Sequence, residues 1–199
     1  MQAYHNDSKI KATYIKRVKA HAEADRIVKG KYWDNGRGCA VGCTIEGSDH
    51  SKYETELGIP SILAYLEDSI FEELPNEEAL KFPLEFLEAI PVGADLSKVI
   101  PKFVVWQFED KKHGLKNIKE VKKDKEVFKL YEEVVALYKR EFVGDKPKED
   151  EYYQLYLKID RAWAWAWAGA WAGAWAGADY ERNVVILKDK LLELLREDV

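Results

Sequence analysis

Residues 162–178 read Ala-Trp-Ala-Trp-Ala-Trp-Ala-Gly-Ala-Trp-Ala-Gly-Ala-Trp-Ala-Gly-Ala, with no charged side chain. Tryptophans recur every four residues from Trp163 to Trp175, and glycines recur every four residues from Gly169 to Gly177. Positions four apart share one face of an α-helix. An offset of two residues turns a helix by about 200°, so the two rows lie on opposite faces. Alternation of Ala and Trp also fits a strand, but the period of four and the high Ala content favour a helix.

A helix that is apolar on all sides is either buried or inserted in a membrane. As a helix, this run would be about 25 Å long, which is at the lower limit for a bilayer span. Arg161 and Asp179 bound it closely. We therefore expect a buried central helix and no membrane span. The glycine row would also permit close approach of a second backbone, which leaves a homodimer open.

The composition predicts one soluble domain over residues 1–199. The net charge of −5 and the pI of about 5.5 argue against a nucleic-acid partner. Lysines gather in residues 111–129 and carboxylates in residues 67–78, and we interpret both groups as solvated helix faces. The polar N-terminus lacks the apolar segment of a secretory signal. Two cysteines among many lysines fit a reducing compartment, so we expect a cytoplasmic location.

Amphipathic patterns between helix-breaking residues predict helices along most of the chain. One clear example covers residues 125–142. A long helix is expected over about residues 150–178, and a terminal helix over about residues 183–197. No segment shows a convincing strand alternation. The predicted fold class is therefore all-α, a single-domain helical bundle around the buried Ala/Trp/Gly-rich helix.

A Gly/Cys-rich loop is predicted over residues 30–50, where five glycines and both cysteines interrupt the helical pattern. Long irregular segments in compact domains often carry function. Cys39 and Cys43 are four residues apart, and His50 follows Cys43 by seven. His21 and Asp25 are also four apart, on the first predicted helix. These five residues are the candidate site.

Three interpretations of this site remain open. In the first, Cys39 or Cys43 is a nucleophile, since a cysteine after glycines at a helix start can have a lowered pKa. His21 or His50 would then be the base, and Asp25 or Asp49 would orient it. In the second, two thiolates and two imidazoles bind tetrahedral zinc. In the third, the cysteines are small buried hydrophobic residues with a structural role.

Other chemical motifs give weaker indications. Glu67, Asp68, Glu72 and Glu73 form a carboxylate ladder on one predicted helix. A di-metal bundle requires Glu-x-x-His motifs from paired helices, and the sequence has none, so we predict no metal from the ladder. Phosphate-loop and dinucleotide motifs are also absent from the sequence, so no cofactor is expected.

Several short segments together resemble a family of uncharacterised bacterial and phage proteins. They are Gly-Lys-Tyr-Trp at 30–33, Gly-Cys-Ala-Val-Gly-Cys-Thr at 38–44, Leu-Gly-Ile-Pro at 57–60, Phe-Glu-Glu-Leu-Pro at 71–75, Gly-Ala-Asp-Leu-Ser at 93–97, and the Ala-rich repeat before the helix that contains Lys190 to Leu195. The resemblance covers most of the chain. It implies no activity, substrate or cofactor.

The sequence names no reaction. The expected role is binding or assembly with an unidentified partner. The alternative is a small cysteine-dependent hydrolase or acyl-transfer enzyme that uses the candidate site, and a zinc-binding module is the third possibility.

Overall fold

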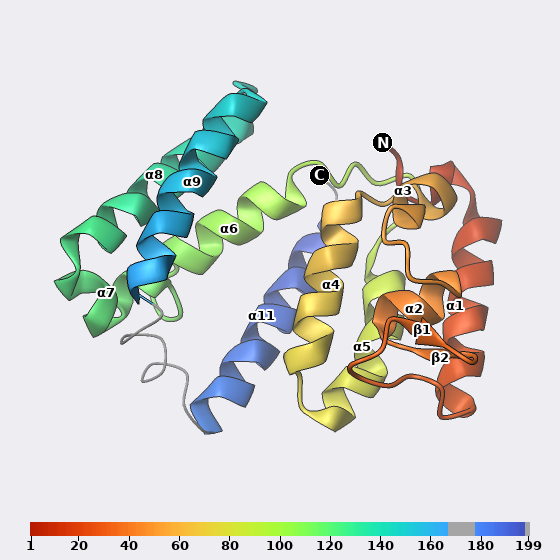
Figure 1. The fold of residues 1–199 in the computed structure, drawn as a ribbon. Coiled ribbons are helices and arrows are strands. Elements are labelled where there is room, and N and C mark those ends of the chain that lie inside the picture. Colours follow the sequence, from red (N-terminus) through yellow and green to blue (C-terminus); the bar gives the residue numbers. More distant parts are fainter. Residues whose placement is uncertain (167–177, 198–199) are drawn as a thin grey trace. The chain divides into compact units, whose positions relative to one another are not determined.

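The computed structural model describes residues 1–166 and 178–197, and it is predominantly helical, as the sequence predicts (Figure 1). The chain divides into two compact units. Unit 1 contains residues 1–99 and the C-terminal residues from 181 onward, and unit 2 contains residues 100–180. The assignment of residues 1–199 to one domain stays a prediction.

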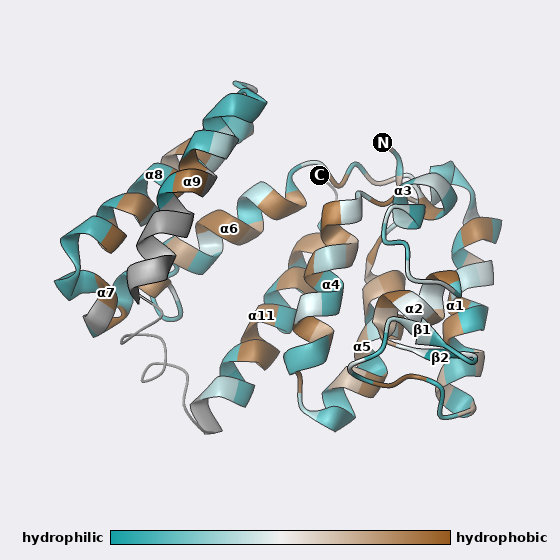
Figure 2. Ribbon diagram, in the orientation of Figure 1, coloured by the Kyte–Doolittle hydropathy of each residue, from teal (hydrophilic) through white to brown (hydrophobic). Residues whose placement is uncertain are grey.

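Unit 1 contains most of the helices and the small sheet. Its elements are η1 (Ala3–Asn6), α1 (Ser8–Glu23), β1 (Trp33–Asp34), β2 (Arg37–Gly38), α2 (Ala40–Ile45), α3 (Lys52–Leu57), α4 (Ser61–Glu73), α5 (Asn76–Ala89) and nearly all of α11 (Ala178–Arg196). Figure 2 shows hydrophobic residues interleaved with hydrophilic ones along α4, α5 and α11, the pattern of helices that bury one face.

Helix α2 lies at the centre of unit 1. Every residue from Cys39 to Ile45 is buried, and the helix contacts α1, α4 and α5. Gly42 is essential to this packing, because a Cβ atom there would lie 1.6 Å from the carbonyl oxygen of Tyr32. The segment that the sequence predicts as a loop therefore contributes a central part of the core.

A tight hairpin precedes α2. Strands β1 and β2 pair antiparallel, with Trp33 opposite Gly38. The two turn residues, Asn35 and Gly36, have φ angles of 51° and 77°. Positive φ at both positions is the requirement of a type I′ hairpin turn, for which Asn-Gly is a preferred pair. Residues 30–50 thus form a hairpin and a short helix in place of the predicted loop.

Helix α11 is held against α5 by a buried ammonium group. The side chain of Lys188 is 7% exposed, and its Nζ atom donates to Glu78 Oε2 and lies 3.7 Å from Glu85 Oε2. Both carboxylates belong to α5. Around this pair, Leu191 and Leu195 of α11 are fully buried. The C-terminal helix is therefore an integral part of unit 1.

Unit 2 contains the remaining elements: α6 (Val99–Glu109, which begins at the end of unit 1), η2 (Leu115–Asn117), α7 (Lys119–Lys123), α8 (Lys125–Phe142) and α9 (Glu149–Ala166). Val134 and Leu137 of α8 form a core with Leu155 of α9. Asp124 caps the start of α8, because its Oδ1 atom accepts from the N–H groups of Glu126 and Val127.

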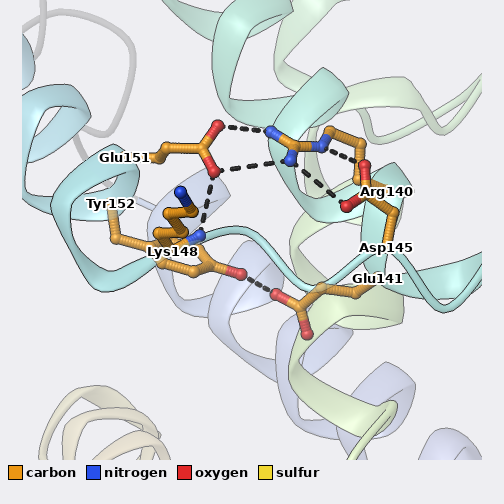
Figure 3. Close-up of polar contacts among 6 residues, drawn as sticks. All are labelled: Arg140, Glu141, Asp145, Lys148, Glu151 and Tyr152. Atoms are coloured by element: carbon orange, nitrogen blue, oxygen red, sulfur yellow. Dashed lines mark hydrogen bonds and ion pairs between the residues drawn. The ribbon is translucent and has the colours of Figure 1, made fainter.

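The turn between α8 and α9 is closed by one arginine (Figure 3). Arg140 donates to Asp145 Oδ2 at 2.7 Å through Nε and to Glu151 Oε2 at 2.5 Å through Nη1. The N–H group of Lys148 donates to the other Glu151 oxygen at 2.9 Å. Because these residues come from α8, the turn and α9, the cluster fixes the angle between the two helices.

The long predicted helix is described only in part. Helix α9 ends its described course at Ala166, and α11 begins at Ala178. The predicted burial of the Trp/Gly rows and their suggested role in a homodimer lie outside the described residues. The terminal helix expected over about residues 183–197 is confirmed as part of α11. In the part of the chain that the structure describes, no helix combines the length and apolar character of a membrane span.

Candidate functional site

Three potential ligands meet where the start of α2 packs against α4. Cys39 precedes the first residue of α2, and Asp68 and Glu72 lie one turn apart on α4. The Cys39 Sγ atom and one carboxylate oxygen from each acidic residue lie within 4.8 Å of one another. Among the described residues, Cys39, Asp68 and Glu72 are the set of at least three potential metal ligands whose ligand atoms lie this close together.

The position of Cys39 is set by its role as the N-cap of α2. Its N–H group donates to the carbonyl oxygen of Lys31 at 2.7 Å. Its Sγ atom accepts from the N–H group of Gly42 at 3.5 Å and lies 3.8 Å from the carbonyl oxygen of Tyr32. The backbone of Tyr32, which packs closely against Gly42, therefore also lies beside the Cys39 thiol.

The carboxylate of Glu72 is oriented by a backbone N–H group. Both of its carboxylate oxygens accept from the N–H group of Gly30, at 3.0 and 2.9 Å. Gly30 has a φ angle of 73°, the left-handed region that glycine adopts without strain. Partial burial raises the pKa of Glu72 above its usual value, although the Gly30 N–H opposes this.

His50 lies beside Asp68 and brings a buried imidazole nitrogen, Nε2, that has no hydrogen-bond partner. Its Nε2 atom lies 3.6 Å from Asp68 Oδ2, and neither His50 Nε2 nor Asp68 Oδ1 has a hydrogen-bond partner. The Tyr65 ring stacks on the imidazole with centroids 4.4 Å apart and planes 2° apart. The Tyr32 ring meets it edge-on at 5.4 Å. The imidazole is thus buried between two tyrosines, with one nitrogen facing a carboxylate.

Glu67 lies next to this cluster and is fully buried. Its Oε2 atom accepts from the Tyr53 hydroxyl at 2.7 Å, and its Oε1 atom has no hydrogen-bond partner. Burial raises the pKa of Glu67 well above its usual value.

The environment of both cysteines opposes a free thiolate. Cys39 and Cys43 are fully buried. Burial, and after it the neighbouring Asp68, raises the pKa of the Cys39 thiol. Burial also raises the pKa of Cys43 to about 11. A nucleophilic cysteine requires the opposite shift, so the chemistry of the metal-free site does not support the nucleophile interpretation, which stays a prediction.

The other predicted site residues lie in different surroundings. His21 Nε2 lies 3.1 Å from Glu46 Oε1, and its ring meets Trp33 edge-on. Cys43 Sγ donates to the carbonyl oxygen of Gly38 at 3.3 Å. Asp25 is exposed and follows the end of α1 with a φ angle of 52°. Of the five predicted residues, the structure brings Cys39 and His50 to the same carboxylate.

Asp68 and Glu72 complete the cluster, although the sequence pattern predicts no metal site for them. They belong to the carboxylate ladder of one helix, and a di-metal site would also require a histidine on that helix. Their spacing of four was the available signal, since it places both carboxylates on one helix face. The third member of the cluster, Cys39, lies at the start of a different helix, α2. The spacing of residues in the sequence does not predict a contact between two helices.

No model of a known protein family, no curated protein and no solved structure matches this chain. The resemblance to uncharacterised bacterial and phage proteins therefore stays a prediction.

Proposed function

We propose that unit 1 is a metal-binding module that holds one divalent transition-metal ion, best zinc, on Cys39, Asp68 and Glu72. The observation that carries the proposal is the convergence of one sulfur and two carboxylate ligand atoms within 4.8 Å. A buried, unpartnered nitrogen of His50 lies 3.6 Å from Asp68 Oδ2 and adds support. Such a nitrogen is costly unless something binds it.

The distances fit a small ion. Zinc binds thiolate sulfur at about 2.3 Å and carboxylate oxygen at about 2.0–2.2 Å in tetrahedral sites. Neighbouring ligand atoms are then roughly 3.3–3.6 Å apart. Atoms that already lie within 4.8 Å of one another reach this geometry through small side-chain rotations.

The ligand types select the class of ion. Calcium and magnesium prefer sites made of oxygen atoms alone, and Cu(I) favours sulfur-rich sites. One thiolate with two carboxylates is a mixed set that suits a borderline ion such as zinc. Bound metal would also displace the Cys39 proton, because the ligand is the thiolate.

Electrostatics supports the same proposal. Asp68 and Glu72 place two acidic groups beside a buried sulfur. Among the described residues neither carboxylate forms an ion pair with Lys or Arg, and the nearby charge of Lys29 lowers the pKa of Glu72 only against the larger effect of burial. A cation bound between them would compensate the cost of burying negative charge. Binding or assembly with a protein partner is compatible with a metal module and stays a prediction from the sequence.

Thermal unfolding with and without zinc tests the proposal. Protein freed of metal with a chelator is melted alone and with zinc in excess. A ligand present at about 100 times its Kd stabilises the native state by roughly 2.7 kcal/mol, so Tm should rise by several degrees. Cys39→Ser should lose this rise. Cys43→Ser removes the other buried thiol and should keep it.

The proposal is wrong if zinc leaves the Tm of the wild type unchanged. It is also wrong if Cys39→Ser folds and shows the same rise as the wild type, because the ion would then bind elsewhere.

A further inference from the structure

We propose that unit 2 carries a second binding site, a pocket between α8 and the end of α6 that takes a small aromatic carboxylate. The rings of the ligand lie against aromatic side chains of the pocket, and its carboxylate pairs with Lys116. The inference does not depend on the proposed metal site, because all residues that line the pocket lie between residues 108 and 139 and belong to unit 2.

The first argument is the size of the pocket. It has a volume of about 310 Å³, and its walls come from α6, η2 and α8. Binding sites for small molecules have volumes of about 300–1,000 Å³, so this pocket lies at the lower end of the range. It therefore accommodates a ligand of one or two rings and is too small for a dinucleotide or another large cofactor.

The second argument is the aromatic lining. Phe128 and Tyr131 lie about one turn apart on α8, and Phe108 comes from α6. The ring centroids of Phe108 and Tyr131 are 4.7 Å apart, with the planes tilted by 38°. All three rings are half-buried, so part of each surface is left for a ligand. Aromatic rings in such a wall attract a flat apolar ligand through offset and edge contacts.

The third argument is the balance of charge around the pocket. Glu109 and Lys139 both line it and neutralise each other, because Lys139 Nζ lies 2.7 Å from Glu109 Oε2. Glu132 is exposed to solvent, which screens its charge. Lys116 is half-buried, and no carboxylate pairs with it among the described residues. The uncompensated charge of the pocket is therefore positive.

These features together select the class of ligand. A single carboxylate supplies the counter-ion that the half-buried ammonium of Lys116 lacks, and an ammonium group has three donors for its oxygens. A neutral aromatic molecule would use the rings but leave the ammonium without a counter-ion. A phosphate ester would bring about two negative charges to one free lysine, beside Glu132. The pocket therefore fits an aromatic monocarboxylate best.

Isothermal titration calorimetry with 2-naphthoate tests the inference. The full-length protein is titrated in the presence of a chelator, so that no bound metal competes for the carboxylate. The matched ligand is 2-naphthamide, which has the same two rings and no charge. The wild type should bind 2-naphthoate about 10-fold more tightly than the amide, which corresponds to one hydrogen bond to a charged group.

Two pairs of variants place the ligand in the pocket. Lys116→Met removes the charge but keeps an unbranched side chain, and it should weaken binding of 2-naphthoate about 10-fold and leave the amide unaffected. Its control is Lys129→Met, an exposed lysine of α8 outside the pocket. Phe128→Ala removes one ring of the wall and should weaken both ligands several-fold. Its control is Tyr153→Ala, an aromatic residue of α9 that is 57% exposed.

Each part of the inference has its own contradicting result. A wild type that binds neither 2-naphthoate nor 2-naphthamide would show that the pocket is not a site for this class of ligand. Equal affinity for the two ligands, or equal affinity of Lys116→Met and Lys129→Met for 2-naphthoate, would exclude pairing with Lys116. Identical binding by Phe128→Ala and Tyr153→Ala would place the ligand outside the pocket. None of these results depends on zinc binding in unit 1.

Discussion

The Sγ atom of Cys39 accepts a hydrogen bond from the N–H group of Gly42 at 3.5 Å, so one thiol caps the central helix of unit 1 and also faces Asp68 and Glu72. Cys39 therefore belongs both to the proposed metal site and to the core of unit 1. This explains why the cysteine is buried, and it links the chemistry of the site to the stability of the unit.

The first prediction concerns thiol reactivity. Both thiols are buried, and both have raised pKa values, that of Cys43 being about 11. Since the thiolate is the reactive form, we expect alkylation of the native, metal-free protein at pH 7 to be roughly two orders of magnitude slower than that of an unperturbed cysteine with a pKa of about 8.5. The denatured protein is the reference. One fast thiol in the native protein would revive the nucleophile interpretation.

The second prediction concerns the packing of α2. Gly42→Ala places a Cβ atom 1.6 Å from the carbonyl oxygen of Tyr32, so the backbone must shift. We expect a loss of about 1–3 kcal/mol or more in the free energy of unfolding, measured in urea. Gly47→Ala is the control, because its nearest contacts are 3.8 and 3.9 Å away. Equal stability of the two variants would contradict the described packing.

The third prediction concerns the attachment of α11. Lys188→Met leaves Glu78 and Glu85 without their buried cation. Breaking a buried pair costs up to 3–5 kcal/mol, and the partial exposure of both carboxylates lowers our expectation to about 1–3 kcal/mol. Lys81→Met removes an exposed partner of Glu78 and should cost less than about 0.5 kcal/mol. Urea unfolding of both variants measures the two losses in the free energy of unfolding. Equal losses for Lys188→Met and Lys81→Met would contradict the prediction.

The fourth prediction is a dependence on pH in unit 2. Hydrogen bonds from Arg140 lower the pKa of Asp145 and of Glu151. A carboxyl group with a lowered folded-state pKa stabilises the protein above its unfolded-state pKa, and the contribution disappears as the pH falls through the folded-state pKa. Arg140→Gln should therefore be less stable than the wild type at pH 7, and the difference should shrink below about pH 4. A difference that is constant from pH 7 to pH 2.5 would contradict the prediction.

Parts of the fold follow directly from local sequence. The amphipathic pattern over residues 125–142 coincides with the bounds of α8, because Asp124 caps its start and Gly144 follows its end. The hairpin was not predicted, although Asn35-Gly36 is a strong turn signal. Its strands have only two residues each, too few to show alternation. Helix α2, with six residues, is likewise shorter than the window in which a helical period is visible.

The candidate site was predictable only in part. The sequence indicates Cys39 and His50 as candidates, because they are reactive residue types in a glycine-rich segment. Their partner Asp68 lies on another helix, and its proximity depends on how α2 packs against α4. The sequence indicates His21 as a candidate on the same grounds, but in the structure His21 pairs with Glu46. Residue type and spacing identify candidates, whereas tertiary packing decides which of them meet.

Equilibrium dialysis against zinc, followed by measurement of bound metal, shows whether the wild-type chain binds an ion at this site. We expect one zinc ion per wild-type chain and a loss of that ion in the double variant Asp68→Asn and Glu72→Gln, which keeps side-chain size and removes both ligand charges. A folded double variant that retains one equivalent of zinc, or a wild type that retains none, would contradict a metal site at Cys39, Asp68 and Glu72.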